Sequence, residues 1–311
     1  MIPKFPDTIP ISLASVRDIS TILSGHLPYS SFNALWLTCQ VESNRVARFG
    51  DGLLVSRGQG ADEHLSILCR QADSRERAVL SEYLGGRELN QALTKIPQCS
   101  LSPLHLAPHA LERRDLFDYI VTIDQLVAPT SAPARELHQM ARAYVEGKGG
   151  ATRIMELPLE SQSLRDEIMG ISMDWLTSSK SDDPGRANEV ATLARCLERH
   201  REFELVAVVA LSDSGTMLGF TINEPMHDGW YMGHFGKVYP RTRGLTVLLE
   251  VETARAMARR GCSVMNFQED LGNLGLRKMK QAWGPAGFLK VYDIRPADGD
   301  EARPPAARQR V

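Results

Sequence analysis

Residues 203–224 contain the feature that most limits the possible folds, two apolar runs joined by a short turn. The first run is FELVAVVAL, the turn contains Asp213-Ser-Gly, and the second run is MLGFTIN. Apolar runs on both sides of a glycine-containing turn predict a β-hairpin. Two helices are predicted before it, at residues 163–180 and 187–200, because their apolar residues recur three or four positions apart. Helices followed by antiparallel strands indicate an α+β fold.

The remainder of the second half continues this alternation of strands and helices. A third strand follows the hairpin, and a long helix then ends at Gly261, since glycine commonly stops a helix. Another strand, another helix and a last strand complete the series. The predicted ranges are 230–238 for the third strand, 245–261 for the long helix, then 262–268, 274–283 and 288–294.

The chain has 311 residues, and one domain per about 100 to 200 residues predicts two domains. The first half reads as a smaller α/β unit, with a hairpin signal at Asp51-Gly52 and a good strand at 116–123. Its predicted helices cover residues 15–26, 31–41, 74–84 and 134–147. A glycine-rich joint follows, and we place the boundary near residue 150. The predicted organisation is one domain at 1–150, a second at 151–297 and a disordered tail at 298–311.

Composition and charge exclude several classes of protein. The formal net charge is −2, which excludes a globally basic nucleic-acid protein but allows local basic patches. Five cysteines form no CxxC pair, so we expect neither a disulfide framework nor a metal site, and no cofactor is indicated. The longest apolar run is far shorter than the roughly 20 residues that span a bilayer. The N-terminus lacks the order of a signal peptide, and a cytoplasmic location is expected.

A first candidate site lies in KVYPRTRGLT, where a strand passes into the long helix. Arg241 and Gly244 precede free N–H groups of a helix start, and Arg243 adds charge, so the segment could bind an anion. Acyl-CoA transferases of the GNAT fold bind pyrophosphate with R-x-x-G-x-[G/A] at this place. The pattern here lacks the last small residue, because Thr246 occupies that position. An ordinary helix start with a surface arginine explains it equally well.

The second candidate site is NFQEDLGNLGLRKMKQAWGP, where two adjacent carboxylates follow a buried strand and precede a basic helix. Either carboxylate could remove a proton from an acceptor amine, and a cation of the helix could offset charge on an oxygen. A purely structural ion-pair turn is the alternative. The candidate residues are Asn266, Glu269, Asp270, Gly272, Gly275, Arg277 and Lys280.

These segments carry a family resemblance. The runs MLGFTINEP, HFGKVYPRTRGLTVLLEVE and MNFQEDLGNLGLRKMKQAW resemble the C-terminal catalytic region of phosphatidylglycerol lysyltransferases and their stand-alone soluble relatives. In that family an N-x-x-E-D-L-G-x-x-G-L-R-x-x-K segment recurs. The stretches RRDLFDYIVTIDQLV and PYSSFNALWLTCQV also resemble the family, so the likeness spans most of residues 25–295.

The resemblance implies a fold and an activity. The implied fold is α/β, with tandem GNAT-like domains, each a mainly antiparallel mixed sheet flanked by helices, related to the Fem-type aminoacyltransferases. The implied activity is transfer of an aminoacyl group from charged tRNA to an amine or hydroxyl. By the same likeness Glu269, Asp270 and Lys280 are expected to be catalytic. The expected substrate or donor contacts are Lys237, Arg241, Arg243, Gly244, Asn266, Gly272, Gly275 and Arg277.

The acceptor and donor stay open in the sequence. Without a membrane half, the resemblance favours a small soluble acceptor with an amine, hydroxylamine, hydrazine or hydroxyl group, in natural-product biosynthesis. An acyl-CoA donor and a non-catalytic metabolite-binding protein are the two alternatives. Relatives often carry a basic helix start after the segment that corresponds to RRDLFDYIVTIDQLV. Here residues 127–143 keep only Arg135 and Arg142, which weakens the expected tRNA contact.

Other features bear on donor and mechanism. Local positive charge favours a nucleic-acid donor, whereas no nucleophile motif is found, which favours direct attack by the acceptor. His234, alone in a strand, is more typical of packing than of catalysis. The oligomeric state is not predicted. The cations that supply the local charge are Arg113, Arg114, Arg255, Arg259, Arg260, Lys278 and Lys280.

Overall fold

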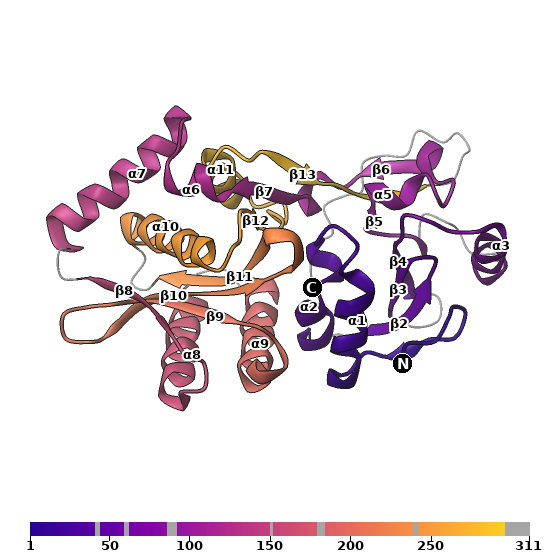
Figure 1. Ribbon diagram of the computed structural model, residues 1–311, viewed down its shortest axis with the longest axis horizontal. Coiled ribbons are helices and arrows are strands. Elements are labelled where there is room, and N and C mark those ends of the chain that lie inside the picture. The colour runs from indigo at the N-terminus through magenta and orange to yellow at the C-terminus, as the bar shows by residue number, and fades with distance from the viewer. Residues whose placement is uncertain are drawn as a thin grey trace.

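The computed structural model describes residues 1–40, 44–58, 62–85, 92–149, 152–178, 184–238 and 242–295. Arg241, the joint at residue 150 and the predicted tail at 298–311 lie outside these residues. Within them the chain forms three sheets and is a mixed α/β structure, as predicted (Figure 1).

The largest sheet has seven strands in the order β13-β7-β12-β11-β10-β9-β8. Neighbouring strands pair antiparallel, except for β11 and β12, which are parallel. The predicted hairpin is β9–β10, and Leu211 lies opposite Met217 in its register. The strand bounds are β7 Asp118–Thr122, β8 Arg153–Leu157, β9 Val206–Leu211, β10 Met217–Pro225, β11 Trp230–Val238, β12 Val264–Asn266 and β13 Gly287–Leu289.

Helices cover both faces of this sheet (Figure 1). Ala207 and Val209 of β9 belong to one apolar core, and Val208 and Ala210 belong to the other. A strand buried on both faces needs a continuous apolar run, which explains the unbroken sequence there. Helices α8 (Gln162–Thr177) and α9 (Pro184–Glu198) lie on the first face, and α6 (Ile123–Val127), α7 (Ala132–Tyr144) and α10 (Arg243–Arg259) lie on the second.

The first half contains an antiparallel sheet in the order β1-β2-β3-β4. The predicted hairpin at Asp51-Gly52 is confirmed, since Phe49 pairs with Gly52. Helix α2 is shorter than the predicted 31–41. The bounds are β1 Ile9–Pro10, β2 Asn44–Phe49, β3 Gly52–Arg57, β4 His64–Leu68, α1 Val16–Leu23, α2 Ala34–Cys39, α3 Ser74–Tyr83 and α5 Gln98–Leu101.

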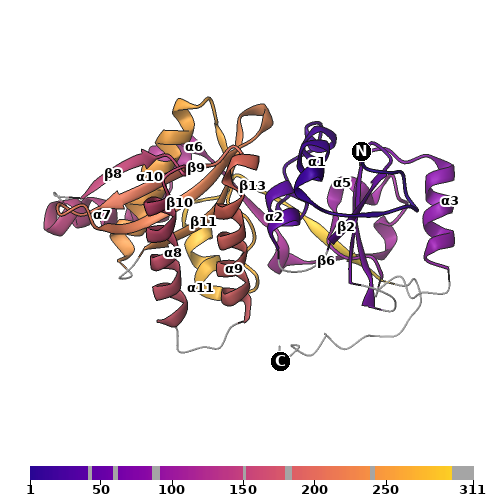
Figure 2. The ribbon, with the colours of Figure 1, turned by 90° about the horizontal axis from the view of Figure 1, so that it is seen from below.

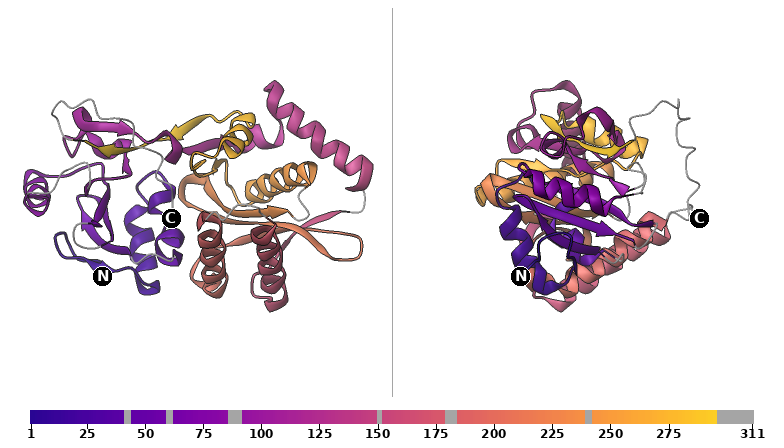
Figure 3. Two further views of the ribbon diagram at one scale, coloured as in Figure 1. Left: turned by 180° about the vertical axis from the view of Figure 1, so that it is seen from behind. Right: turned by 90° about the vertical axis from the view of Figure 1, so that its right-hand side faces the viewer.

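The two halves exchange strands. Strand β7 comes from the first half of the sequence but pairs with β12 and β13 in the large sheet. The single strand predicted at 288–294 is wrong, because the chain changes sheets at Lys290. Gly287–Leu289 pairs with β7, whereas β14 (Val291–Ile294) pairs with β5 (Ile96–Pro97) and β6 (Ala110–Glu112) in a three-stranded sheet (Figure 3). The division near residue 150 stays a prediction.

Two arginines at the end of α9 bind the end of α2. Arg195 Nη1 donates to the Gln40 carbonyl at 2.7 Å, and Arg199 Nη1 donates to the Thr38 carbonyl at 3.0 Å. Cations stabilise the carbonyl end of a helix, here the end of α2. Helix α2 therefore lies beside α9, which covers the first face of the large sheet (Figure 2). Among the helices of the described residues, none is long and apolar enough to cross a membrane.

Candidate active site

The second candidate site forms a tight turn between β12 and α11 (Leu274–Ala282). Gln268, Leu271 and Gly272 all have positive φ, at 56°, 52° and 75°. For a residue other than glycine this conformation costs about 1 kcal/mol or more, so the surrounding contacts must hold the turn. Gly272 meets the requirement without strain, as glycine does. Asn273 caps the start of α11, since its Oδ1 accepts from the N–H groups of Gly275 and Leu276.

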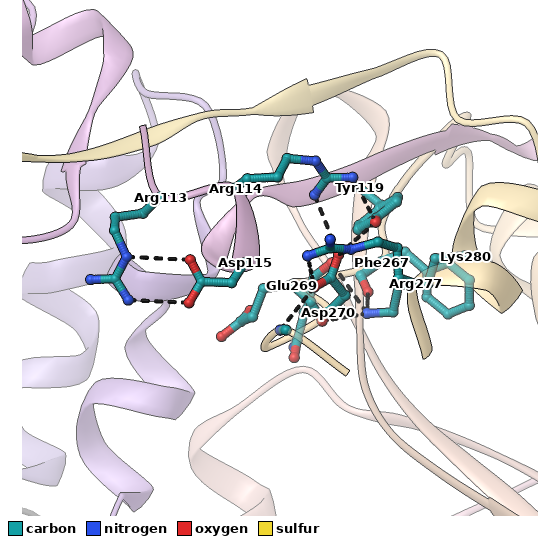
Figure 4. Close-up of polar contacts among 11 residues, drawn as sticks. Arg113, Arg114, Asp115, Tyr119, Phe267, Glu269, Asp270, Arg277 and Lys280 are labelled. Atoms are coloured by element: carbon teal, nitrogen blue, oxygen red, sulfur yellow. Dashed lines mark hydrogen bonds and ion pairs between the residues drawn. The ribbon is translucent and has the colours of Figure 1, made fainter. Parts of the chain in front are cut away.

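Asp270 is the centre of the contacts that hold this turn (Figure 4). Arg277 donates to both carboxylate oxygens, through Nε at 2.8 Å and Nη2 at 2.9 Å. The Tyr119 hydroxyl donates at 2.7 Å, Arg114 Nη1 donates at 3.3 Å, and the Gly272 N–H donates at 2.9 Å. Burial alone would raise the pKa of Asp270, but the hydrogen bonds from Arg277, Tyr119 and Gly272 lower it to about 2. A carboxylate so fully engaged is a poor general base at neutral pH.

Lys280 closes the same turn from α11. Its buried ammonium donates to the carbonyls of Phe267, Gln268 and Glu269, the last two at 3.2 and 2.8 Å. Burial lowers the pKa of Lys280 to about 8, although the nearby Glu269 and Asp118 carboxyls oppose this shift. The three donors of the ammonium are thus used on backbone carbonyls. This geometry fits a positioning role for Lys280, whose ammonium holds the backbone of the turn.

Glu269 points into a second cluster, built from three separate parts of the chain. Its Oε2 lies 3.0 Å from the Ser30 hydroxyl, which also lies 2.6 Å from Asp118 Oδ1. Asp118 Oδ2 accepts from the Ser30 N–H at 2.7 Å and from Asn266 Nδ2 at 3.0 Å. Asp118 is fully buried, and burial together with the charge of Glu269 raises its pKa to about 7. Asn266, predicted as a contact residue, therefore belongs to this carboxyl cluster.

A third polar group lies on the other side of the turn. Glu224 Oε2 accepts from Asn33 Nδ2 at 2.7 Å and contacts His234 Nε2 at 3.0 Å. His234 Nδ1 lies 3.3 Å from Gln268 Nε2, so the turn joins both polar groups. The predicted packing of His234 is correct as far as burial goes, since its ring is buried. It is also fully hydrogen-bonded, which the sequence did not indicate.

The polar groups gather where two parallel strands separate. The last paired residues of β11 and β12 are Met232 and Asn266. Beyond them β11 continues to Val238, whereas β12 ends and is followed by the turn. The contact between His234 and Gln268 joins β11 to the turn beyond this point. Residues of both halves contribute to these polar groups, since Ser30 and Asn33 belong to the first half.

Lys237 lies apart from this place. Its ammonium contacts Glu189 Oε1 at 2.5 Å and lies 4.1 Å from the ring centroid of Trp175. Glu189 and Trp175 belong to α9 and α8, which cover the first face of the sheet. The predicted contact residue Lys237 thus joins the sheet to its helices.

The first candidate site has a structural explanation for its glycine. A Cβ atom on Gly244 would lie 2.6 Å from the Met140 carbonyl and 2.7 Å from Tyr144 Cβ, both on α7. The carbonyl end of α7 therefore packs against the start of α10, and the partial charges of the two helix ends are complementary. Arg243 is exposed, and Arg241 lies outside the described residues. The glycine is needed for helix packing whether or not an anion binds.

Replacing Gly244 with alanine is expected to lower the free energy of unfolding by about 1 to 3 kcal/mol, the usual cost of overpacking. The expected measurement is urea unfolding followed by circular dichroism. Gly170→Ala is the matched control, because Gly170 lies in α8 with open space around it and should gain up to about 1 kcal/mol. Equal stability of Gly244→Ala and the unchanged protein would contradict the packing explanation.

Most of the cations predicted to form a basic surface are ion-paired. Arg114 contacts Asp270, and both Arg259 and Arg260 contact Glu156. Arg113 contacts Asp115 and Asp293, and Arg255 contacts Glu252. Pairing leaves less positive charge for phosphate than the sequence indicated.

The sequence missed the polar partners that the first half brings to the site. Ser30, Asn33 and Asp118 lie far from the turn in sequence, and Glu224 lies in the hairpin. A signal was present for Asp118, because a charged residue interrupts the apolar strand run LFDYIVTI. Buried charges in strands are unusual unless they are paired or functional.

The comparisons with known proteins place this arrangement in a family. Residues 102–295 match the family described as phosphatidylglycerol lysyltransferase, C-terminal. The chain belongs to this family. The matched range contains the whole turn, its partners Arg114 and Tyr119, and the start of α10. No curated protein has a significant match to the sequence.

Solved structures support the fold. A conserved protein of unknown function from Bacteroides thetaiotaomicron VPI-5482 has a TM-score of 0.76 at 18% identity, over 94% of this chain and 98% of that one. L-PGS from Bacillus licheniformis has a TM-score of 0.61 at 14% identity, over 97% and 95%. FemX has a TM-score of 0.52 at 10% identity, over 93% and 97%. At these identities the likeness concerns the fold alone, which is the predicted α/β arrangement of mainly antiparallel sheets flanked by helices.

Proposed function

We propose that this protein transfers an aminoacyl group from aminoacyl-tRNA to an amine-like or hydroxyl group of a small soluble acceptor, in natural-product biosynthesis. The observation that carries the proposal is the family match over residues 102–295, which includes Glu269. Glu269 Oε1 has no hydrogen-bond partner among the described residues, whereas the neighbouring Asp270 is fully engaged. We therefore assign the general base to Glu269 and treat Asp270, Arg277 and Lys280 as positioning residues.

Direct attack by the acceptor is the mechanism that we propose. The aminoacyl ester is already activated, so the protein mainly aligns the two substrates and accepts a proton. The state of the cysteines supports this proposal. Burial raises the pKa of all five thiols, to about 11 for Cys39 and about 12 for Cys69, so thiolate nucleophiles are scarce.

The packing of Gly244 weighs against the acyl-CoA alternative. That alternative was favoured by the spacing from Arg241 to Thr246 as a pyrophosphate site. The glycine of the pattern is explained by contact with α7, whose carbonyl end already faces the start of α10. Arg243 alone is then a weak reason to propose a CoA donor. The non-catalytic alternative predicts that Glu269 can be replaced without loss of any reaction.

The experiment that tests the function supplies the purified chain with radiolabelled aminoacyl-tRNA pools and, separately, with acyl-CoAs. Loss of label from tRNA that depends on an added amine or hydroxyl acceptor is the expected result. Acceptor-dependent use of acyl-CoA with no use of charged tRNA would contradict the donor assignment.

Binding of tRNA is expected to weaken as salt increases, because binding to phosphates releases counterions. We expect a shallow slope of log affinity against log salt, equivalent to only a few phosphate contacts, since most of the predicted cations are ion-paired. Filter binding across a salt series measures the slope. Lys278→Ala should reduce it by about 1 if this exposed lysine contacts a phosphate. Affinity that does not change with salt would contradict phosphate binding.

A further inference from the structure

The Ser30 hydroxyl faces two carboxyl groups at once. Its Oγ lies 2.6 Å from Asp118 Oδ1 and 3.0 Å from Glu269 Oε2. A serine hydroxyl carries one proton and can donate to only one of these oxygens. If both carboxyls were ionised, the other contact would bring two lone pairs together with no hydrogen between them. The geometry therefore requires one further proton in this cluster.

The hydrogen bonds of Asp118 indicate where this proton lies. Asp118 Oδ2 already accepts from the Ser30 N–H and from Asn266 Nδ2, so it is the unprotonated oxygen. Asp118 Oδ1 contacts only the Ser30 hydroxyl among the described residues. The side chain is fully buried, and burial of a carboxyl favours its neutral form. The proton is thus best placed on Oδ1, from which it points at Ser30.

We propose that Asp118 and Glu269 share one proton through the Ser30 hydroxyl, with Asp118 Oδ1–H donating to Ser30 Oγ and Ser30 Oγ–H donating to Glu269 Oε2. Asp118 is then the neutral acid of the pair, and Glu269 is the carboxylate. Its role is to orient the Ser30 hydroxyl toward Oε2, which leaves Glu269 Oε1 to meet the acceptor. Asp118 and Ser30 are positioning residues in this arrangement.

The catalytic use of this arrangement rests on the proposed aminoacyl transfer. The acceptor nitrogen or oxygen bonds to the ester carbonyl carbon, and its proton passes to the Glu269 carboxylate. The bond from the carbonyl carbon to the ribose oxygen then breaks, and the ribose oxygen takes the proton back from Glu269. Protons and charge balance over the two steps, and Glu269 is again a carboxylate at the end.

Other charged and titratable groups act on the pair from the elements around it. Lys280 of α11 favours ionised carboxyls through its ammonium, although its donors are bound to backbone carbonyls. Tyr29 faces Asp118 from the segment before Ser30, and burial raises the pKa of its hydroxyl, which stays neutral. Asp270 in the same turn is ionised and paired with Arg277. His234 and Glu224 reach the turn through Gln268, on its other side.

Infrared difference spectroscopy on the full chain tests the shared proton without any substrate. At mildly acidic pH we expect the C=O band of a neutral carboxylic acid in the unchanged protein and its loss in Asp118→Asn. Because the pKa of Asp118 is raised to about 7, the band should disappear as the pH rises through that value. Glu269→Gln removes a negative neighbour, which lowers the pKa of Asp118. The band should therefore disappear at a lower pH in this variant.

Two further variants keep the test decisive. Burial also raises the pKa of Glu250 to about 7, so Glu250→Gln identifies the band that belongs to that group. In Ser30→Ala both carboxyls remain, and the Asp118 band should shift because the acid loses its hydrogen-bond acceptor. Near-UV circular dichroism checks that each variant is folded.

The shared proton is overturned if the Asp118→Asn spectrum equals that of the unchanged protein, or if Ser30→Ala leaves the band in place. Either result would leave aminoacyl transfer itself untouched, because no donor or acceptor is present. A protein with the expected bands but no transfer from charged tRNA would instead contradict the proposed function alone.

Discussion

Asp270→Asn is expected to lower the free energy of unfolding by about 3 kcal/mol. Removing one partner of a buried ion pair usually costs about 3 to 5 kcal/mol, because the other charge is left uncompensated. The lower end applies here, since Arg277 and Arg114 are 27% and 34% exposed and can reach water. The asparagine amide also has only one acceptor oxygen, whereas five donors contact the Asp270 carboxylate. Urea unfolding followed by tryptophan fluorescence measures the loss.

The matched control is Asp115→Asn, which removes another arginine contact at the residue next to Arg114. Asp115 pairs with Arg113, and both side chains are about a third exposed, at 38% and 35%. Exposed pairs contribute at most about 1 kcal/mol, so this variant should change stability little. Figure 4 shows the Arg113–Asp115 pair to one side of the Asp270 contacts. Equal losses in both variants would mean that Asp270 does not organise the turn.

Local patterns were sufficient to predict most of the elements. The hairpin β9–β10, the long helix α10 and the turn before α11 depend on residues within a few positions of one another. Their apolar spacing and their glycines are visible in the sequence. The exchange of β7 and β14 between sheets is different, because the pairing partners are more than a hundred residues apart. Nothing in residues 288–294 marks Lys290 as the point where the chain changes sheets.

The candidate site divides in the same way. The sequence motif was sufficient to locate the turn. Because Glu269 and Asp270 are consecutive, the sequence offered both equally as candidates for the general base. Their environments differ because partners distant in sequence, Arg114 and Tyr119 for one and Ser30 for the other, reach opposite sides of the turn. Spacing alone cannot indicate which carboxylate is buried in an ion pair. The proposed assignment of the general base to Glu269 therefore depends on the tertiary structure.

Glu269→Gln is expected to reduce turnover by about 100-fold or more while leaving stability nearly unchanged. General base catalysis typically contributes about 10² to 10⁴ in rate, and the amide cannot accept the proton of the acceptor. Stability should be retained because the amide oxygen can still accept from Ser30, and Glu269 forms no ion pair among those described. Steady-state transfer from charged tRNA, with donor binding measured separately, detects the change.

The split between turnover and binding decides the role of Glu269. A general base acts in the transition state, so its loss should lower kcat and kcat/KM together and leave donor affinity unchanged. Glu252→Gln is the control, since Glu252 pairs with Arg255 on α10 and has no contact with the turn. If Glu269→Gln keeps full turnover but loses donor affinity, the carboxylate binds substrate and another group accepts the proton. If it keeps both, the turn is structural, and the non-catalytic alternative gains its first support.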